Sequence, residues 1–343
     1  MLIWFRPLPR DAALKSTIKD HKSQEVSIAN EVPNLVVVGS SNMDLVVRSV
    51  RIPVPGETIL GGEFLMVPGG KGANQAVAAA KLGAHVSFVA RLGNDVFGRK
   101  SLENFRLEGL DTTYVTLTSD APSGVALITV DEAGNNAIVV APGANAKLSP
   151  EDVRRAEAQI RSAGAVVAQL EVPMATIQRA AEIAREAGVP FILNPAPAQP
   201  LNPGLLGMVA VLTPNETEAR ILTGIEVVDE DSARKAAVVL MDAGVKAVIV
   251  TMGSKGFLLA EGNTMELVPA MEVKAVDTTA AGDAFTGSLA VGLAQGQSLR
   301  DAALFAGRVA AFSVTRLGAQ PSMPTRAELD EFTADHAIPR RME

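Results

Sequence analysis

The segment best suited to chemistry is residues 277–283, DTTAAGD, which places small residues directly before a strongly apolar stretch that begins near Asp283. Small side chains let a ligand approach the backbone, and the free amides at a helix start carry partial positive charge. We therefore expect the amides from Ala280 to Asp283 to form an anion hole for a transferring phosphoryl group. The Asp283 carboxylate would take the proton of an attacking hydroxyl, although Asp is also a common helix cap.

Two further segments carry residue types that suit a small polar ligand. Residues 68–75, PGGKGANQ, put glycines where a ligand needs to touch the backbone, but their spacing is not that of a Walker A loop, and a tight turn with a solvated lysine is the alternative. Asn42 and Asp44 follow the first apolar run, at a strand end where open α/β sheets bind ligands. An amide beside a carboxylate suits the vicinal hydroxyls of a sugar, although both residue types are also common in turns.

Residues 214–218, PNETE, also follow an apolar run. Acidic residues in a first helical turn interact favourably with the helix dipole, which is the simplest interpretation. In the functional interpretation, Asn215 and Glu218 position water-coordinated Mg²⁺ on the phosphates of a nucleotide. The three histidines lie outside all of these segments, so a histidine-based triad or zinc site is not expected.

The composition narrows the class of protein. With 343 residues, of which 48% are hydrophobic, the chain can form one large or two modest globular domains. A net charge of −7 makes nucleic acids and anionic membranes unfavourable partners, and the apolar runs are too short to span a bilayer. The absence of cysteine excludes disulfides, thiolate catalysis and cysteine-ligated metals. We expect a soluble, cytoplasmic protein.

The two ends of the chain differ from its middle. Residues 1–33 have mixed charges and little periodicity, so we interpret them as an N-terminal extension, disordered or a leader segment, and not as a signal or transit peptide. Residues 336–343 form a short C-terminal tail. The domain expected between them spans residues 34–335.

Within this domain, short runs rich in Val, Ile and Leu alternate with longer Ala-rich segments, a pattern typical of parallel strands joined by helices. Continuous apolar runs indicate strands buried on both faces. The expected strands are 35–39, 86–90, 165–170, 191–194, 209–213, 247–251 and 257–260. The expected helices are 74–82, 151–162, 175–187, 216–222, 232–243, 283–294 and 299–315.

Two stretches interrupt this alternation, at about residues 45–66 and 114–140. In the second, GVALITV (124–130) and AIVV (137–140) flank a DEAG turn, which predicts a β-hairpin. Strands inserted in this way between βα units would form a small separate sheet over the mouth of the main one, which we call the lid.

Taken together, these segments resemble the ribokinase-like (PfkB) carbohydrate kinases over about residues 34–335. Residues 69–75, GGKGANQ, match the first signature of that family, and residues 277–283 match the second. The segments NPAPA (194–198) and VTRLGAQPS (314–322) resemble its ribose-specific branch in particular. The resemblance implies a three-layer α/β/α fold with a mainly parallel central sheet and a β-sheet lid. It also implies ATP-dependent phosphorylation of the 5-hydroxyl of D-ribose.

The resemblance assigns roles to individual residues. Asp283 would be the general base, and the anion hole would be formed by Ala280, Ala281 and Gly282. The sugar would contact Asn42, Asp44, Gly70, Lys71, Asn74, Glu171 and Asp283. ATP would lie near Asn215, Thr251, Gly253, Ser254, Gly256 and Gly282. Mg²⁺ would be associated with Asn215 and Glu218, and an activating K⁺ with Asp277, Thr279, Ser313, Arg316, Gly318 and Ser322.

A homodimer joined through the lid is a further implication of the resemblance. Several alternatives stay open at this point. One is a kinase of the same fold that acts on deoxyribose, fructose or a nucleoside, which a panel of sugars would separate. Another is a sugar-binding regulator without catalysis, against which the intact Asp283 argues. A NAD-linked dehydrogenase lacks its glycine fingerprint here.

Overall fold

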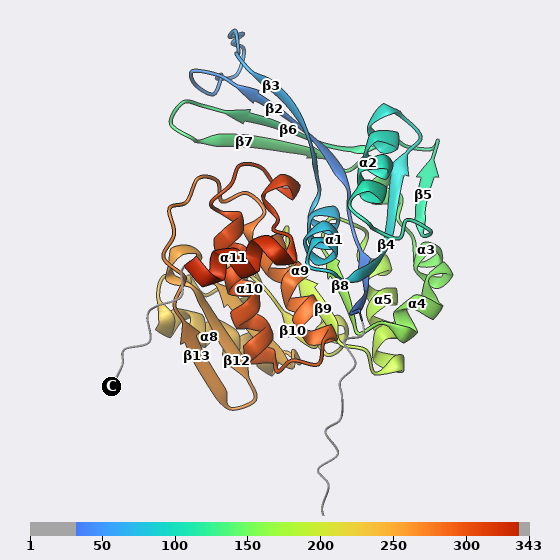
Figure 1. The fold of residues 1–343 in the computed structure, drawn as a ribbon, viewed down its shortest axis with the longest axis vertical. Coiled ribbons are helices and arrows are strands. Elements are labelled where there is room, and N and C mark those ends of the chain that lie inside the picture. The colour runs from blue at the N-terminus through green and yellow to red at the C-terminus, as the bar shows by residue number, and fades with distance from the viewer. Residues whose placement is uncertain (1–31, 336–343) are drawn as a thin grey trace, which may run out of the picture. The chain divides into compact units, whose positions relative to one another are not determined.

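A nine-stranded sheet forms the centre of the part of the chain that the computed structural model describes, residues 32–335 (Figure 1). The strand at residues 257–261 pairs antiparallel with both of its neighbours, and every other pairing in this sheet is parallel. The strand order is β13 (Thr264–Val268), β12 (Phe257–Glu261), β11 (Ala247–Thr251), β10 (Val211–Leu212), β9 (Phe191–Asn194), β8 (Ala165–Gln169), β1 (Asn34–Val38), β4 (His85–Gly93) and β5 (Val115–Thr118).

Helices cover both faces of this sheet because its central strands are apolar on both sides. In β1, Leu35 and Val37 belong to one buried cluster, while Val36 and Val38 belong to the other. The first cluster is completed by α1 (Lys71–Lys81), α2 (Val96–Leu107), α9 (Ala281–Ala294), α10 (Leu299–Ser313) and α11 (Arg326–Asp335). The second is completed by α3 (Pro150–Arg155), α4 (Glu157–Ser162), α5 (Met174–Ala187), α6 (Pro203–Leu206), α7 (Glu216–Thr223) and α8 (Glu230–Asp242). The expected three-layer α/β/α fold is confirmed.

A second sheet of four strands stands apart from the large one, as Figure 1 shows. Strands 42–48 and 124–130 pair parallel at its centre, and strands 64–69 and 136–141 add antiparallel at its two edges. The expected hairpin, formed by strands 124–130 and 136–141, is confirmed. The order is β3 (Phe64–Gly69), β2 (Asn42–Arg48), β6 (Gly124–Val130) and β7 (Asn136–Ala141). This small sheet is the lid.

The structure corrects the expected elements in several places. The segment 114–140 was expected to lie entirely in the lid, but β5 pairs with β4 at the edge of the large sheet. The helix expected over 151–162 is two helices, because the backbone leaves the helical region at Ala156 (φ −96°, ψ 9°). Helix α2 was not expected, and of its residues only Gly98, Ser101 and Phe105 are buried, so a single large apolar side chain marks its inner face.

The interpretations of residues 1–31 as an extension and of 336–343 as a tail lie outside the described residues. Within residues 32–335, no helix combines the length and the apolar character that crossing a membrane requires.

Candidate active site

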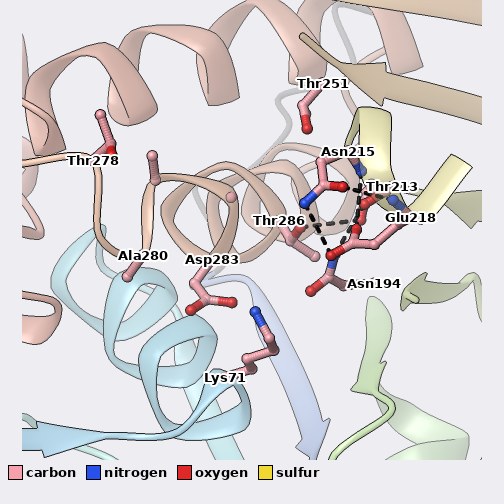
Figure 2. Close-up of a pocket in the computed structure, with 12 residues that line it drawn as sticks. Lys71, Asn194, Thr213, Asn215, Glu218, Thr251, Thr278, Ala280, Asp283 and Thr286 are labelled. Atoms are coloured by element: carbon pink, nitrogen blue, oxygen red, sulfur yellow. Dashed lines mark hydrogen bonds between the residues drawn. The ribbon is translucent and has the colours of Figure 1, made fainter. Parts of the chain in front are cut away.

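A pocket of about 150 Å³ lies where strands of the large sheet end and several helices begin (Figure 2). Residues from β9, from the start of α1, from the start of α7 and from the start of α9 contribute to its wall. Such a position, beyond the carboxyl ends of parallel strands, is where open α/β sheets bind ligands. The lining residues are Lys71, Asn194, Thr213, Asn215, Glu218, Thr251, Thr278, Ala280, Ala281, Gly282, Asp283 and Thr286.

The start of α9 presents open backbone amides to this pocket. Ala280 is the N-cap, with a left-handed backbone (φ 60°) that no other described non-glycine residue adopts. No described residue accepts a hydrogen bond from the amides of Gly282 and Asp283. A Cβ added at Gly282 would meet no atom within 4 Å, so its missing side chain leaves space that opens into the pocket. These two amides are therefore available to an anion. The Ala281 amide, which was also expected in the anion hole, instead donates to the Thr278 carbonyl at 3.3 Å.

Asp283 does not cap its helix, so the alternative role considered for it is not the one seen here. Its side chain is 4% exposed and lies in the pocket wall. Two neighbouring residues of α1 hold the carboxylate, because Asn74 Nδ2 donates to Oδ2 and Gln75 Nε2 donates to Oδ1, each at 2.9 Å. Figure 2 shows the ammonium group of Lys71 and this carboxylate directed toward one another. The charge of Asp283 raises the pKa of Lys71, and Lys71 therefore stays a cation at neutral pH.

Glu171 fixes the entry of the chain into α1. Its Oε2 accepts hydrogen bonds from Ser40 Oγ at 2.5 Å and from the Lys71 amide at 3.0 Å. The amide of Gly72 in turn donates to Ser40 Oγ at 3.2 Å. Glu171 is thus tied to the same helix start as Lys71, although it lies 100 residues away in the sequence.

Asp44 lies on the lid strand β2 and points its carboxylate over Gly69, where a Cβ would collide with it. Burial, followed by the charges of Glu171 and Asp283, raises the pKa of Asp44 to about 7. The three expected sugar-binding carboxylates are therefore close enough to interact electrostatically. A cluster of this kind suits a neutral ligand with several hydroxyl donors.

Asn42 begins the same strand and is 4% exposed. Its Oδ1 accepts from Asn145 Nδ2 at 2.7 Å, and the amide of Asn145 also bonds both backbone groups of Ser41. Gly70 lies against this backbone with φ 90°, where a Cβ would be 2.6 Å from the Asn42 nitrogen. Close backbone approach thus accounts for Gly70.

The residues expected at the nucleotide are only partly brought together. Asn215 caps α7 and shares reciprocal hydrogen bonds with Glu218, and an isolated β-bridge links Asn215 to Thr251. All three residues line the pocket. Burial raises the pKa of Glu218, against the opposing effect of its hydrogen bond from Asn215. Gly253 and Ser254 lie on the exposed turn η2 (Gly253–Lys255), outside the pocket wall.

Gly256 follows that turn with φ 100°, and a Cβ there would collide with the Val268 carbonyl. The backbone conformation and this close contact explain Gly256 without a ligand.

Only some of the residues expected to bind a monovalent cation are linked to one another. Asp277 accepts from the amides of Thr279 (2.9 Å) and Gly318 (2.8 Å). Burial alone would raise the pKa of Asp277, but hydrogen bonds from the side chain and amide of Thr279 and from the amide of Gly318 together lower it. The carbonyl of Ser313 accepts from the Arg316 amide at 3.1 Å. Within the described part of the chain, Ser322 makes no hydrogen bond to this group, and its hydroxyl donates to the Ala319 carbonyl.

Several residues that line the pocket or support its wall were not expected from the sequence. Asn194 ends β9 and Thr213 follows β10, so both occupy strand ends, the one signal that could have found them. The side chain of Asn194 donates to the Thr213 carbonyl at 2.9 Å, and the hydroxyls of Thr213 and Thr286 are 3.1 Å apart. Gln75 ends the GGKGANQ segment but was given no role, and Asn145 carried no signal of its own.

Comparison with known proteins identifies the family of the chain. The family model described as pfkB family carbohydrate kinase matches residues 32–326. The chain is 46% identical to the ribokinase of Haemophilus influenzae over 88% of this chain and 99% of that protein. It is 41% identical to the deoxyribokinase of Salmonella typhi over 87% of this chain and 98% of that protein.

Among solved structures, the ribokinase of Arabidopsis thaliana complexed with ribose and ATP is 36% identical. It matches with a TM-score of 0.82 over 88% of this chain and 98% of its own. The expected family is confirmed by the family model, the identity and the fold together. The chain belongs to the pfkB family of carbohydrate kinases.

Proposed function

We propose that this kinase transfers the γ-phosphoryl group of ATP to the 5-hydroxyl of D-ribose, giving D-ribose 5-phosphate and ADP. One observation supports it above the others. The buried Asp283 carboxylate and the two open amides of Gly282 and Asp283 occur at the same helix start and face the same pocket. A proton acceptor and an anion hole at one point are what phosphoryl transfer to a hydroxyl requires.

In the proposed step, the sugar oxygen forms a bond to the γ-phosphorus of ATP while the bond from that phosphorus to the β,γ-bridging oxygen breaks. The electron pair of the broken bond leaves with ADP. The hydroxyl proton passes to the Asp283 carboxylate and later to solvent. The amides of Gly282 and Asp283 donate to the phosphoryl oxygens, which carry the negative charge during transfer.

Asn215, Glu218 and Thr251 are proposed to line the nucleotide side. Their place in the pocket supports this role, and Glu218, whose carboxylate is already tied to Asn215, suits a Mg²⁺ ion held through water. Such an ion would neutralise charge on the phosphates. Because ATP is the donor, we place the reaction in the cytoplasm.

Asp277, Thr279, Ser313, Arg316, Gly318 and Ser322 are proposed to surround an activating K⁺. The Asp277 carboxylate and the carbonyl-rich turns beside it offer oxygen ligands, which a hard cation prefers. Asp277 and Thr279 immediately precede the proposed anion hole in the chain, and a cation there would stabilise the turn that carries Ala280.

On the sugar side, Asn42, Asp44, Gly70, Lys71, Asn74 and Glu171 are the proposed contacts. A specific observation favours deoxyribose as a second candidate, since the deoxyribokinase of Salmonella typhi is 41% identical over 87% of this chain. A comparison of the turnover of D-ribose and 2-deoxyribose distinguishes the two candidates.

The test is ADP release with MgATP against D-ribose, 2-deoxyribose, fructose and adenosine, first in sodium and then in potassium buffer. We expect ribose to have the highest kcat/KM and potassium to raise the rate. Asp283→Asn should keep ribose binding, measured by calorimetry, and lose about 10²–10⁴-fold in kcat. Near-normal turnover of Asp283→Asn would refute its role as base, and silence with every sugar would refute the proposed reaction.

We also propose that a second copy of the chain covers the lid. Paired residues place Met66, Leu45, Leu127 and Val139 in one row across its four strands. Met66, Leu127 and Val139 are 46%, 52% and 67% exposed. A continuous apolar row of this kind is typical of a protein–protein contact.

A further inference from the structure

Gln75 is a fully buried amide that the proposed reaction does not yet use. It lies on α1, is 0% exposed and is absent from the pocket wall formed by the described residues. Its Nε2 donates to Asp283 Oδ1 at 2.9 Å and to Asn194 Oδ1 at 3.2 Å, and its Oε1 accepts from Gln169 Nε2 at 2.6 Å. Gln75 therefore connects the proposed base to two strands of the large sheet.

The orientation of this amide is set by a backbone group. The Thr213 carbonyl can only accept, so Asn194 must present its NH₂ group to it, as it does at 2.9 Å. The Oδ1 of Asn194 then faces Gln75, which must present its own NH₂ group. The same NH₂ group is thereby directed at Asp283.

At Gln169, where this series of hydrogen-bonded side-chain amides ends, the fixed direction of the bonds is destabilising. Gln169 presents its NH₂ group to Gln75, which leaves Gln169 Oε1 buried with no hydrogen-bond partner among the described residues. A buried carbonyl without a donor is destabilising. An apolar residue at position 169 would avoid this cost but would leave the side-chain oxygen Oε1 of Gln75 without its donor. Gln169 therefore fixes the side chain of Gln75 at some cost in the stability of the fold.

Helix packing brings Gln75 within reach of Asp283. A Cβ added at Gly287 of α9 would lie 2.5 Å from the backbone carbonyl oxygen of Gln75 and 3.1 Å from the Cβ of Ala78. The absence of a side chain at Gly287 therefore lets α1 and α9 approach closely.

We propose that Gln75 is a positioning residue for Asp283, an inference that rests on the proposed function. Its hydrogen bond holds Oδ1 while Asn74 holds Oδ2, so the carboxylate cannot rotate away from the sugar hydroxyl. Each carboxylate oxygen keeps a second lone pair that can accept the hydroxyl proton. The orientation of the base in the wall of the sugar site thus depends on an amide that does not itself line the pocket.

The test compares Gln75→Leu and Gln75→Glu with the wild type. In Gln75→Leu we expect kcat to fall about 10- to 100-fold with unchanged affinity for ribose, as for other residues that orient a reactive group. In Gln75→Glu only the protonated side chain can donate to Asp283, so kcat should fall as the pH rises, over a range where wild-type kcat is constant. A merely structural role would not produce this pH dependence.

Ser288→Ala is the matched control, because Ser288 is a buried polar residue of α9. Among residues 32–335, its hydroxyl bonds only its own helix, at the Ala284 and Phe285 carbonyls. It should leave kcat unchanged. Normal kcat in Gln75→Leu together with an inactive Asp283→Asn would overturn the positioning role and leave the proposed reaction intact. If Gln75→Leu does not fold, a Gln75→Glu enzyme with the wild-type pH profile overturns the inference.

Discussion

Replacing Asp44 by Asn is expected to stabilise the ligand-free protein at neutral and alkaline pH. Burial and the nearby charges of Glu171 and Asp283 raise the pKa of Asp44 from its ordinary 3.8 to about 7. The folded state therefore disfavours the ionised carboxylate, whereas the unfolded chain accepts it readily. Asn is similar in size and has no charge, so it removes this penalty.

The sign and size of the effect follow from linkage. A group whose pKa is raised on folding contributes stability that is fully present below pH 3.8 and is lost as the pH rises through about 7. At about 1.4 kcal/mol for each pKa unit, the rise from 3.8 to about 7 corresponds to at most about 4 kcal/mol. About 2–3 kcal/mol of this falls between pH 5 and pH 8.

The assay is urea unfolding of the wild type and Asp44→Asn at pH 5, 6, 7 and 8, without sugar. The unfolding free energy of Asp44→Asn relative to the wild type should increase over this range. Asp131→Asn is the control, because hydrogen bonds from Asn135 lower the pKa of Asp131 on the same lid below its ordinary 3.8. Asp131 is therefore ionised in both the folded and the unfolded chain from pH 5 to pH 8, and the difference between Asp131→Asn and the wild type should not change over this range. A pH-independent difference between Asp44→Asn and the wild type would refute the reasoning.

Two further predictions concern the anion hole and the lid. Gly282→Ala should keep or raise the unfolding free energy by up to about 1 kcal/mol, since its Cβ meets no atom, yet kcat should fall at least about 10-fold because the methyl group enters the phosphoryl site. Normal kcat would show that the phosphate does not approach this backbone. Leu127→Glu places a charge in the apolar row of the lid and should give a monomer in light scattering. A wild type that is already monomeric at micromolar concentration would contradict the proposed dimer.

Much of the fold could be predicted because its signals are local. The strands at 191–194 and 247–251 were expected at their observed bounds, since continuous apolar runs require burial on both faces. The open amides of Gly282 and Asp283 have an equally local origin, because the first amides of a helix lack an intrahelical acceptor.

Elements with weak local patterns were placed by their neighbours. Val115–Thr118 lies in the segment 114–140 that was expected to form part of the lid, but pairing with β4 puts it in the large sheet. A short strand does not encode its partner, because backbone hydrogen bonds are the same for any sequence.

The support of Asp283 belongs entirely to the tertiary structure. Gln75 and Asn194 are 119 residues apart, and Gln75 and Asp283 are 208 apart, so nothing in the sequence joins them. The adjacency of β9 and β10 brings Asn194 to the Thr213 carbonyl, and Gly287 brings α1 to α9. An amide in a sequence is equally suited to solvent, a turn or a core. Only packing that excludes water and fixes a single donor direction makes it the support of a base.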